Sequence, residues 1–193
     1  MKIIGVGCGP GLLTEQAIYE ISKARIIYGS DRAIDLAKSC IPADCTVKTI
    51  DDFKQLTTLS DNAVILSTGD PMLAGLGYLP GEVIPGISSF QLATARLKIP
   101  VSQASVIVAH GKGHEKGIQD TVQEVKRGRI VFLLADPKFP VEDLYTRLAT
   151  LKKPLKIALC ENLGYPHERI TVQDIQSLPR PTEALYSLVI GHF

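Results

Sequence analysis

The sequence predicts an α/β protein built from two α/β domains with a ligand cleft between them. Short apolar runs of strand length alternate along the chain with helical segments that start at capping residues. Glycine-rich loops follow several of these runs, and open α/β sheets bind ligands beyond the carboxyl ends of their strands. A basic, glycine-rich segment, His110-Gly-Lys-Gly-His114, interrupts the alternation and is typical of a hinge between two lobes.

The composition indicates an ordinary globular protein that is large enough for a substantial core. The 193 residues are 45% hydrophobic and 21% charged, and the net charge of +1 gives no reason to expect nucleic acid or an anionic membrane as partner. We expect no metal site, since the cysteines form no Cys-x-x-Cys pair and are best interpreted as reduced thiols. The first residues lack the layout of a signal peptide and no apolar run could span a membrane, so we expect a cytoplasmic protein.

The first loop is unusually rich in glycine. A predicted strand over 2–6 runs into Gly5-Val-Gly-Cys-Gly-Pro-Gly11, and Thr14 then provides a helix N-cap. The dinucleotide fingerprint fits in neither register, because Pro10 and Leu12 stand where glycine or alanine is needed, and no P-loop lysine follows. Glycine allows tight turns and close approach of a ligand to the backbone. We therefore interpret this loop as a wall beside a flat or bulky ligand.

The central stretch is an apolar strand over 63–67 that ends in Thr68-Gly-Asp-Pro71. Asp70 is placed either to cap a helix predicted over 72–79 or to accept a hydrogen bond from a ligand hydroxyl. An ordinary strand-to-helix loop has the same pattern, so the sequence leaves both interpretations open.

A third loop has a similar layout. A strand ends at Pro85-Gly86, and Ser88 and Ser89 open a helix predicted over 90–97. Hydroxyl and N–H groups at a helix start can bind a polar ligand or can simply cap the helix.

The hinge-like segment predicts two domains, 1–110 with the glycine-rich loop and the Gly-Asp-Pro turn, and 111–193. In the second domain we expect neighbouring strands over 156–160, 168–172 and 185–191. No long helix separates them, so we expect antiparallel pairing.

Five motifs occur in an order that resembles the tetrapyrrole (corrin/porphyrin) methylase family. They are Gly5-Val-Gly-Cys-Gly-Pro-Gly11, Ser67-Thr-Gly-Asp-Pro-Met-Leu-Ala-Gly75, Ile84-Pro-Gly-Ile-Ser-Ser-Phe90, Ala109-His-Gly111 and Glu161-Asn-Leu-Gly-Tyr-Pro-His-Glu-Arg169. The resemblance implies a methyltransferase that uses S-adenosylmethionine (SAM). The most similar branch methylates carbon 5 of cobalt-precorrin-7 in cobalamin biosynthesis. The chain departs from the family pattern at Cys8, where proline is usual, and at Lys112, where arginine is usual.

The resemblance also implies site residues and partners. The residues implied to bind SAM, in a folded conformation between the domains, are Gly69, Asp70, Leu73, Ser88, Ser89, Leu134 and Ala135. The residues implied to bind the tetrapyrrole are Cys8, Gly9, Pro10, His110, Lys112 and Arg169. A homodimer is implied, and a separate protein is implied for the decarboxylating methylation of the same pathway.

Methyl transfer from SAM requires mainly that the methyl donor and the acceptor carbon are aligned. A base then removes a proton from the ring. His110 and Glu161 are the candidate bases. The carboxylates of a tetrapyrrole need cations, for which His114, Lys116 and Arg32 are further candidates, although each suits a solvated surface equally well.

Two other functions stay open at the level of the sequence. One is methylation by the same family of another ring carbon or of a diphthamide precursor. The other is a non-catalytic module that binds a dinucleotide or ATP on a glycine-rich α/β scaffold.

Overall fold

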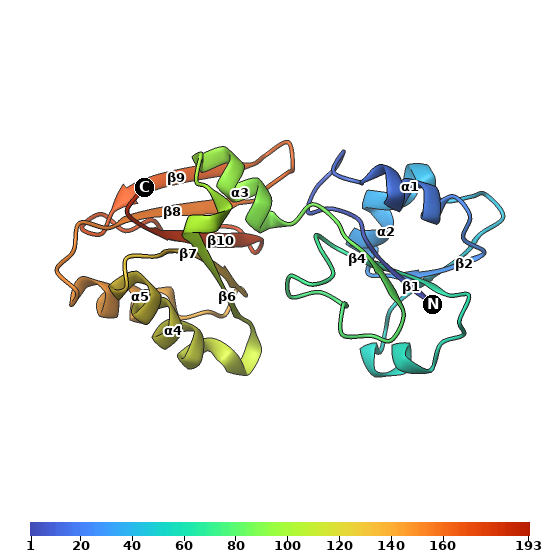
Figure 1. The fold of residues 1–193 in the computed structure, drawn as a ribbon, viewed down its shortest axis with the longest axis horizontal. Coiled ribbons are helices and arrows are strands. Elements are labelled where there is room, and N and C mark those ends of the chain that lie inside the picture. The colour runs from blue at the N-terminus through green and yellow to red at the C-terminus, as the bar shows by residue number, and fades with distance from the viewer. The chain divides into compact units, whose positions relative to one another are not determined.

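The computed structural model describes residues 1–193 apart from the side chain of Lys112. The chain forms two compact units, Met1–Ser89 and Phe90–Phe193, and each has its own five-stranded sheet (Figure 1). The predicted α/β class with two α/β domains is therefore confirmed. No helix in the described part of the chain is long and apolar enough to cross a membrane.

The first unit is a parallel sheet with the strand order β3-β2-β4-β1-β5. Its strands are β1 (Lys2–Gly5), β2 (Ile26–Gly29), β3 (Thr46–Thr49), β4 (Val64–Ser67) and β5 (Glu82–Ile84). Its helices are α1 (Glu15–Ile21), α2 (Asp31–Ala37) and the 3₁₀ helices η1 (Lys38–Cys40) and η2 (Phe53–Thr58). Thr14 caps α1 as predicted, since its hydroxyl accepts a hydrogen bond from the N–H of Ala17 at 3.1 Å.

Both faces of this sheet are covered, as expected for a parallel sheet. Alternate strand residues such as Ile4 and Leu66 pack with α1 and α2. Their neighbours Ile3 and Ile65 pack on the other face with Leu56 and Leu79. Every residue of β4 is buried. The apolar run predicted as a strand over 63–67 is therefore covered on both faces of the sheet, as its composition predicts.

The helix predicted over 72–79 is wrong, because the chain makes a series of turns there. Ala74 has a left-handed φ of 56°, and the hydroxyl of Ser67 accepts a hydrogen bond from the N–H of Leu76 at 3.3 Å. A Cβ on Gly75 would lie 2.6 Å from that hydroxyl. The segment therefore folds back against the end of β4, and a regular helix would break these contacts.

The second unit contains a mixed sheet with the order β6-β7-β10-β8-β9. Its strands are β6 (Ala104–Ala109), β7 (Ile130–Ala135), β8 (Lys156–Glu161), β9 (Arg169–Asp174) and β10 (Tyr186–Gly191). Its helices are α3 (Ser89–Leu97, whose first residue ends the first unit), α4 (His114–Lys126), α5 (Val141–Ala149), and the 3₁₀ helices η3 (Val101–Gln103) and η4 (Gly111–Gly113). The last three strands pair antiparallel, which confirms that prediction.

The division between the units differs from the boundary predicted at 110/111. β6 pairs in parallel with β7 along its whole length, from Ala104 opposite Ile130 to Ala109 opposite Ala135. The segment from Phe90 to His110 therefore belongs to the second sheet and its coverings. Local glycine content marked a loop at residues 110–114, but strand pairing decides which unit β6 joins.

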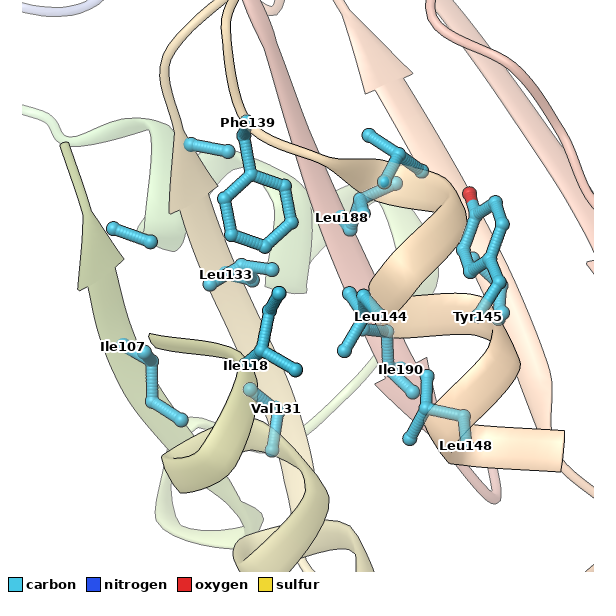
Figure 2. Packing of buried hydrophobic residues seen from close by; sticks show 14 of the residues in the cluster. Ile107, Ile118, Val131, Leu133, Phe139, Leu144, Tyr145, Leu148, Leu188 and Ile190 are labelled. Atoms are coloured by element: carbon cyan, nitrogen blue, oxygen red, sulfur yellow. The ribbon is translucent and has the colours of Figure 1, made fainter. Parts of the chain in front are cut away.

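The core of the second unit lies between its sheet and the helices α4 and α5 (Figure 2). Leu133 and Leu188 point from the sheet toward Ile118 of α4 and Leu144 of α5. On the opposite face, α3 contributes the ring of Phe90, which packs edge-to-face on Phe132.

Glycines allow the loops of the first sheet to approach one another. A Cβ on Gly5 would lie 2.5 Å from the backbone nitrogen of Gly86 and 2.8 Å from the carbonyl oxygen of Gly69. No side chain fits between these backbones. The ends of β1, β4 and β5 thus meet in direct backbone contact.

We predict that Gly5→Ala lowers the free energy of unfolding by roughly 2 to 3 kcal/mol, because the added methyl group meets rigid backbone. The measurement is equilibrium unfolding in urea, where we expect a lower midpoint concentration and an unchanged dependence of the free energy of unfolding on urea concentration. Gly113→Ala is the matched control, since a Cβ there has no neighbour within 4 Å and φ is −87°. Equal midpoints for the wild type and Gly5→Ala would contradict the proposed close approach.

Candidate functional site

Three motif loops are joined at the carboxyl edge of the first sheet by backbone hydrogen bonds. The N–H of Gly69 donates to the carbonyl of Gly7 at 2.8 Å, and the N–H of Gly7 donates back at 3.3 Å. The N–H of Cys8 donates to the carbonyl of Ile87 at 3.0 Å. The loops after β1, β4 and β5 therefore form one structure, at the edge where open α/β sheets bind ligands.

Asp70 adds a side-chain link to this edge. One carboxylate oxygen accepts a hydrogen bond from the N–H of Met72 at 2.8 Å, and the other accepts from the N–H of Gly86 at 3.1 Å. Each carboxylate oxygen thus binds a different loop. The sequence leaves open whether Asp70 caps its own turn or binds a ligand. In the structure its carboxylate accepts from the N–H of Met72, as a capping residue does, and it also bridges to the loop after β5.

The space beside Gly69 is where the predicted cofactor contacts gather. Gly69 has a left-handed φ of 69°, and a Cβ added to it would find only the Cα of Ser88, at 3.9 Å. Ser88 is buried, and Leu73 follows Asp70 in the same turn, with its N–H 3.0 Å from the Asp70 carbonyl. The structure thus places Asp70 and Leu73 in the turn after Gly69, and Ser88 beside Gly69.

The predicted substrate residues of the first loop lie beside this space. Cys8 is half-buried, Gly9 is buried, and Pro10 is exposed. Gly11 has no atom within 4 Å of the position of an added Cβ, so the tip of this loop is open. A bulky ligand could lie against the tip without displacing side chains.

The second sheet repeats the same arrangement at its own edge. Asp136 follows β7 and precedes a proline, as Asp70 follows β4 and precedes a proline. One oxygen of Asp136 accepts from the N–H of Lys138 at 2.8 Å, and the other accepts from the N–H of Gly111 at 2.6 Å. The sequence predicts a turn at Ala135-Asp-Pro137 but does not indicate Asp136 as a site residue, although the strand-Asp-Pro pattern repeats that of Asp70.

His114 completes this second cluster. Its Nε2 lies 2.8 Å from the carboxylate of Asp136, and its ring packs edge-to-face on Phe139. The hydrogen bonds from His114 and then from Gly111 lower the pKa of Asp136 to about 2. The sequence predicts His114 as a cation that binds a substrate carboxylate. In the structure its ring instead contacts Asp136, which also accepts a hydrogen bond from Gly111, the residue after His110.

His110 and the predicted cofactor residues Leu134 and Ala135 lie at the same edge of the second sheet. Ala109 is opposite Ala135 in the parallel pairing, so the loops after β6 and β7 leave the sheet side by side. His110 is exposed there. Lys112, the remaining prediction in this loop, lies in η4, and its side chain is outside the described part of the structure.

Glu161, the other candidate base, is fully buried. Its carboxylate accepts hydrogen bonds from Arg169 Nε at 2.9 Å, from the N–H of Thr182 at 2.7 Å and from the N–H of Glu183 at 3.0 Å. Burial alone would raise its pKa, but the hydrogen bonds from Thr182, Arg169 and Glu183 outweigh burial and hold the pKa below its usual value. The geometry therefore favours a structural carboxylate over a base.

The same motif contains a second structural carboxylate. Glu168 accepts from the N–H of Gly164 at 2.7 Å and pairs with Arg96 of α3 at 2.7 Å. Its pKa is also lowered, because hydrogen bonds from Gly164 and Arg96 outweigh the effect of burial. The charged residues of this motif organise the β8–β9 connection, and Arg169, predicted to bind substrate, is half-exposed with its guanidinium bound to Glu161.

The remaining predicted cations have different surroundings. Lys116 pairs with Asp120 on the exposed side of α4, which is the solvated arrangement that the sequence also allowed. Arg32 donates to the hydroxyl of Thr68 at 3.0 Å. In the described part of the chain, no group of three or more His, Cys, Asp or Glu residues is placed to hold a metal ion.

We predict that Glu161→Gln destabilises the protein by roughly 3 kcal/mol at neutral pH, because an amide cannot accept from donors on both sides. The measurements are the midpoint of equilibrium unfolding in urea and the rate of the catalysed reaction per folded protein molecule. Glu142→Gln, which removes an exposed pair with Arg180, should change stability by less than about 0.5 kcal/mol. A loss of turnover without a loss of stability would instead assign Glu161 as a base.

We predict a pH-dependent effect of Asp136→Asn. The pKa of Asp136 is lowered in the folded state, from 3.8 to about 2, so its contribution to stability is complete above the unfolded value and declines as the pH falls toward 2. At pH 6 the variant should be less stable by roughly 2 kcal/mol, and this difference should shrink at pH 3. Urea unfolding at both values tests this, with Asp120→Asn as control. A difference that grows on acidification would refute the assignment.

Comparison with known proteins places this arrangement in a family. Residues 2–179 match the model of the tetrapyrrole (corrin/porphyrin) methylases. The probable cobalt-precorrin-7 C(5)-methyltransferase of Methanocaldococcus jannaschii is 31% identical over an alignment of 194 positions that covers 90% of this chain and 89% of the relative.

Two solved structures agree with this match. The precorrin-6Y methylase CbiE of cobalamin biosynthesis from Archaeoglobus fulgidus superposes with a TM-score of 0.76 at 29% identity, covering 99% of this chain and 96% of its own. The uroporphyrin-III C-methyltransferase of Thermus thermophilus, complexed with S-adenosylhomocysteine, shares the fold with a TM-score of 0.67 at 18% identity, covering 98% and 96%. The chain therefore belongs to the tetrapyrrole (corrin/porphyrin) methylases.

Proposed function

We propose that this protein transfers a methyl group from SAM to carbon 5 of cobalt-precorrin-7 in cobalamin biosynthesis. The observation that carries this proposal is the 31% identity to a probable cobalt-precorrin-7 C(5)-methyltransferase over 90% of the chain. Membership of a methylase family sets aside the alternative of a non-catalytic nucleotide-binding module.

SAM as cofactor fits the residues of the first sheet edge. A Cβ added to Gly69 would meet only the Cα of Ser88 within 4 Å, and Asp70 joins the loops after β4 and β5 through two hydrogen bonds. A solved family neighbour is complexed with S-adenosylhomocysteine, the demethylated form of SAM. When bound, SAM supplies a methyl group that its sulfonium has already activated.

The protein's own residues then have mainly a positioning role. We propose that Gly69, Asp70, Leu73, Ser88 and Ser89 contact the cofactor, with Asp70 acting through the loops that it joins. Holding donor and acceptor in line accounts for much of the rate enhancement in such a transfer. The predicted contacts of Leu134 and Ala135 with the cofactor remain predictions.

On the substrate side, we propose that Cys8, Gly9 and Pro10 line the tetrapyrrole. The ring carbon forms the new bond with its own electron pair, and the sulfur keeps the pair of the bond that breaks. A ring proton must then leave. His110 is the proposed base, because it is exposed at the edge of the second sheet, whereas the Glu161 carboxylate is occupied. Arg169 and Lys112 remain proposed substrate contacts.

The proposal extends to assembly and pathway. We propose a homodimer that works in the cytoplasm, with another protein carrying out the decarboxylating methylation. Methylation of a different ring carbon or of a diphthamide precursor is the competing possibility. The position of a ¹³C-labelled methyl group, transferred to cobalt-precorrin-7 and located by NMR, distinguishes these: label at carbon 5 supports the proposal, and label elsewhere or no transfer overturns it.

We predict one-to-one binding of S-adenosylhomocysteine per subunit in calorimetric titration, weakened at least tenfold by Asp70→Ala, since the loops around Gly69 then lose two hydrogen bonds. Asp52→Ala is the matched control, because Asp52 also accepts a hydrogen bond from the N–H two residues later, at 2.9 Å, in the β3–β4 connection. Binding of NAD or ATP in place of S-adenosylhomocysteine would refute the proposed cofactor.

A further inference from the structure

We infer that Arg32 binds a carboxylate group of the tetrapyrrole substrate. This inference rests on the proposed function and adds a residue that determines substrate binding. It depends on four observations: the position of Arg32 at the sheet edge, its unfavourable place in helix α2, the lack of a carboxylate partner, and its link to the Gly-Asp-Pro turn.

Arg32 lies at the edge of the first sheet where the candidate site is. It is the second residue of α2, directly beyond the carboxyl end of β2. Since β2, β4, β1 and β5 are parallel, the loops after these strands leave the sheet at this same edge. The loops at 5–14, 68–81 and 85–88 contain no lysine or arginine, so the motif loops themselves carry no cation. At the same edge, Arg32 follows β2 and Lys54 follows β3, and of these two it is Arg32 that bonds to a motif loop.

The first turn of a helix is an unfavourable place for a cation. The helix dipole and the free N–H groups favour anions there and oppose a guanidinium. Asp31, in the same turn, fits the rule, and its carboxylate accepts a hydrogen bond from the hydroxyl of Thr49 at 3.2 Å. Arg32 breaks this rule, and its hydrogen bond to the neutral Thr68 hydroxyl does not neutralise its charge; such local exceptions are expected at functional sites.

Arg32 also differs from the other arginines in its partners. The arginines that pair with carboxylates in the described part of the chain are Arg25, Arg96, Arg127, Arg147, Arg169 and Arg180. Arg129 instead donates to the Ser105 hydroxyl and to two backbone carbonyls. Arg32 is exposed, and among the described residues its hydrogen bond is to the neutral hydroxyl of Thr68. Asp35, one turn further along α2, forms no ion pair with it.

Thr68 connects this guanidinium to the site. Nη2 of Arg32 lies 3.0 Å from Oγ1 of Thr68, the residue directly before Gly69 and Asp70. This hydrogen bond engages one nitrogen of a planar group that has five N–H donors. The remaining donors are available for the two-point contact that guanidinium groups make with carboxylates.

The chemistry of the ligand follows from these donors. Corrin precursors carry acetate and propionate side chains, each a planar carboxylate. The amino-acid part of SAM also carries a carboxylate, but only one, and it is accompanied by the cationic ammonium and sulfonium groups of the same molecule. The observations therefore favour the substrate as the source of the carboxylate, and the cofactor becomes a separate outcome of the test.

The test compares Arg32→Gln with Arg25→Gln in steady-state methylation of cobalt-precorrin-7. Arg25 is the matched control, because it is an exposed arginine of the same unit that pairs with Asp44 and its loss changes the net charge equally. We expect Arg32→Gln to raise KM for the tetrapyrrole about ten- to a hundredfold, with kcat within about threefold and the Kd of S-adenosylhomocysteine unchanged. Arg25→Gln should leave all three values unchanged.

Two further variants separate binding from folding. Arg32→Lys should restore part of the loss, because it keeps the charge but not the two-point contact. Thr68→Val should raise KM in the wild type and have no further effect in Arg32→Gln, as expected if the hydroxyl acts only by orienting the guanidinium.

Several results would overturn the inference. An unchanged KM in Arg32→Gln would do so, as would an equal rise in Arg25→Gln, which would indicate only long-range charge. Weaker binding of S-adenosylhomocysteine with an unchanged KM would assign the carboxylate to the cofactor instead. If the wild type neither binds S-adenosylhomocysteine nor methylates the tetrapyrrole, the proposed function itself fails, and the inference fails with it.

Discussion

The candidate site depends on an aspartate that precedes proline at the end of a parallel strand and bridges two loops. In the first unit, the carboxylate of Asp70 accepts hydrogen bonds from its own turn and from Gly86 of a neighbouring loop. In the second unit, Asp136 does the same with its own turn and with Gly111. A carboxylate suits this task because its two oxygens can each accept a charge-assisted hydrogen bond from a different segment. Each sheet edge thereby acquires loops of defined geometry.

Glycine makes these bridges possible. The loops of the first unit touch through the backbones of Gly5, Gly69 and Gly86, with no room for a side chain between them. The donors at Gly86 and Gly111 are also backbone groups, so the edge is built mostly from main-chain atoms. Such a framework loses little conformational freedom when a ligand binds. A Cβ added at Gly11 would meet no atom within 4 Å, and one added at Gly69 would meet only the Cα of Ser88.

The β8–β9 motif illustrates a different lesson about charged residues. The sequence suggests Glu161 as a candidate base and Arg169 as a substrate contact. In the structure, Glu161 is buried and bound to Arg169, and Glu168 is bound to Gly164 and Arg96. A buried carboxylate requires such partners to remain ionised. In this chain the charged residues of the motif therefore organise the β8–β9 connection. His110, on an exposed loop, remains the proposed base.

The sequence by itself determined the alternation of strands and helices, the two-sided burial of β4, the cap at Thr14 and the membership of a methylase family. These features follow from local periodicity, capping chemistry and motif order, all of which are properties of neighbouring residues. Only the tertiary structure decided that β6 belongs to the second sheet, that the segment after Pro71 forms turns instead of a helix, and that the Glu161 carboxylate is buried and hydrogen-bonded. It also decided which charges have partners and that Arg32 has no carboxylate partner among the described residues. These outcomes depend on contacts between residues far apart in the chain, and no local pattern contains that information.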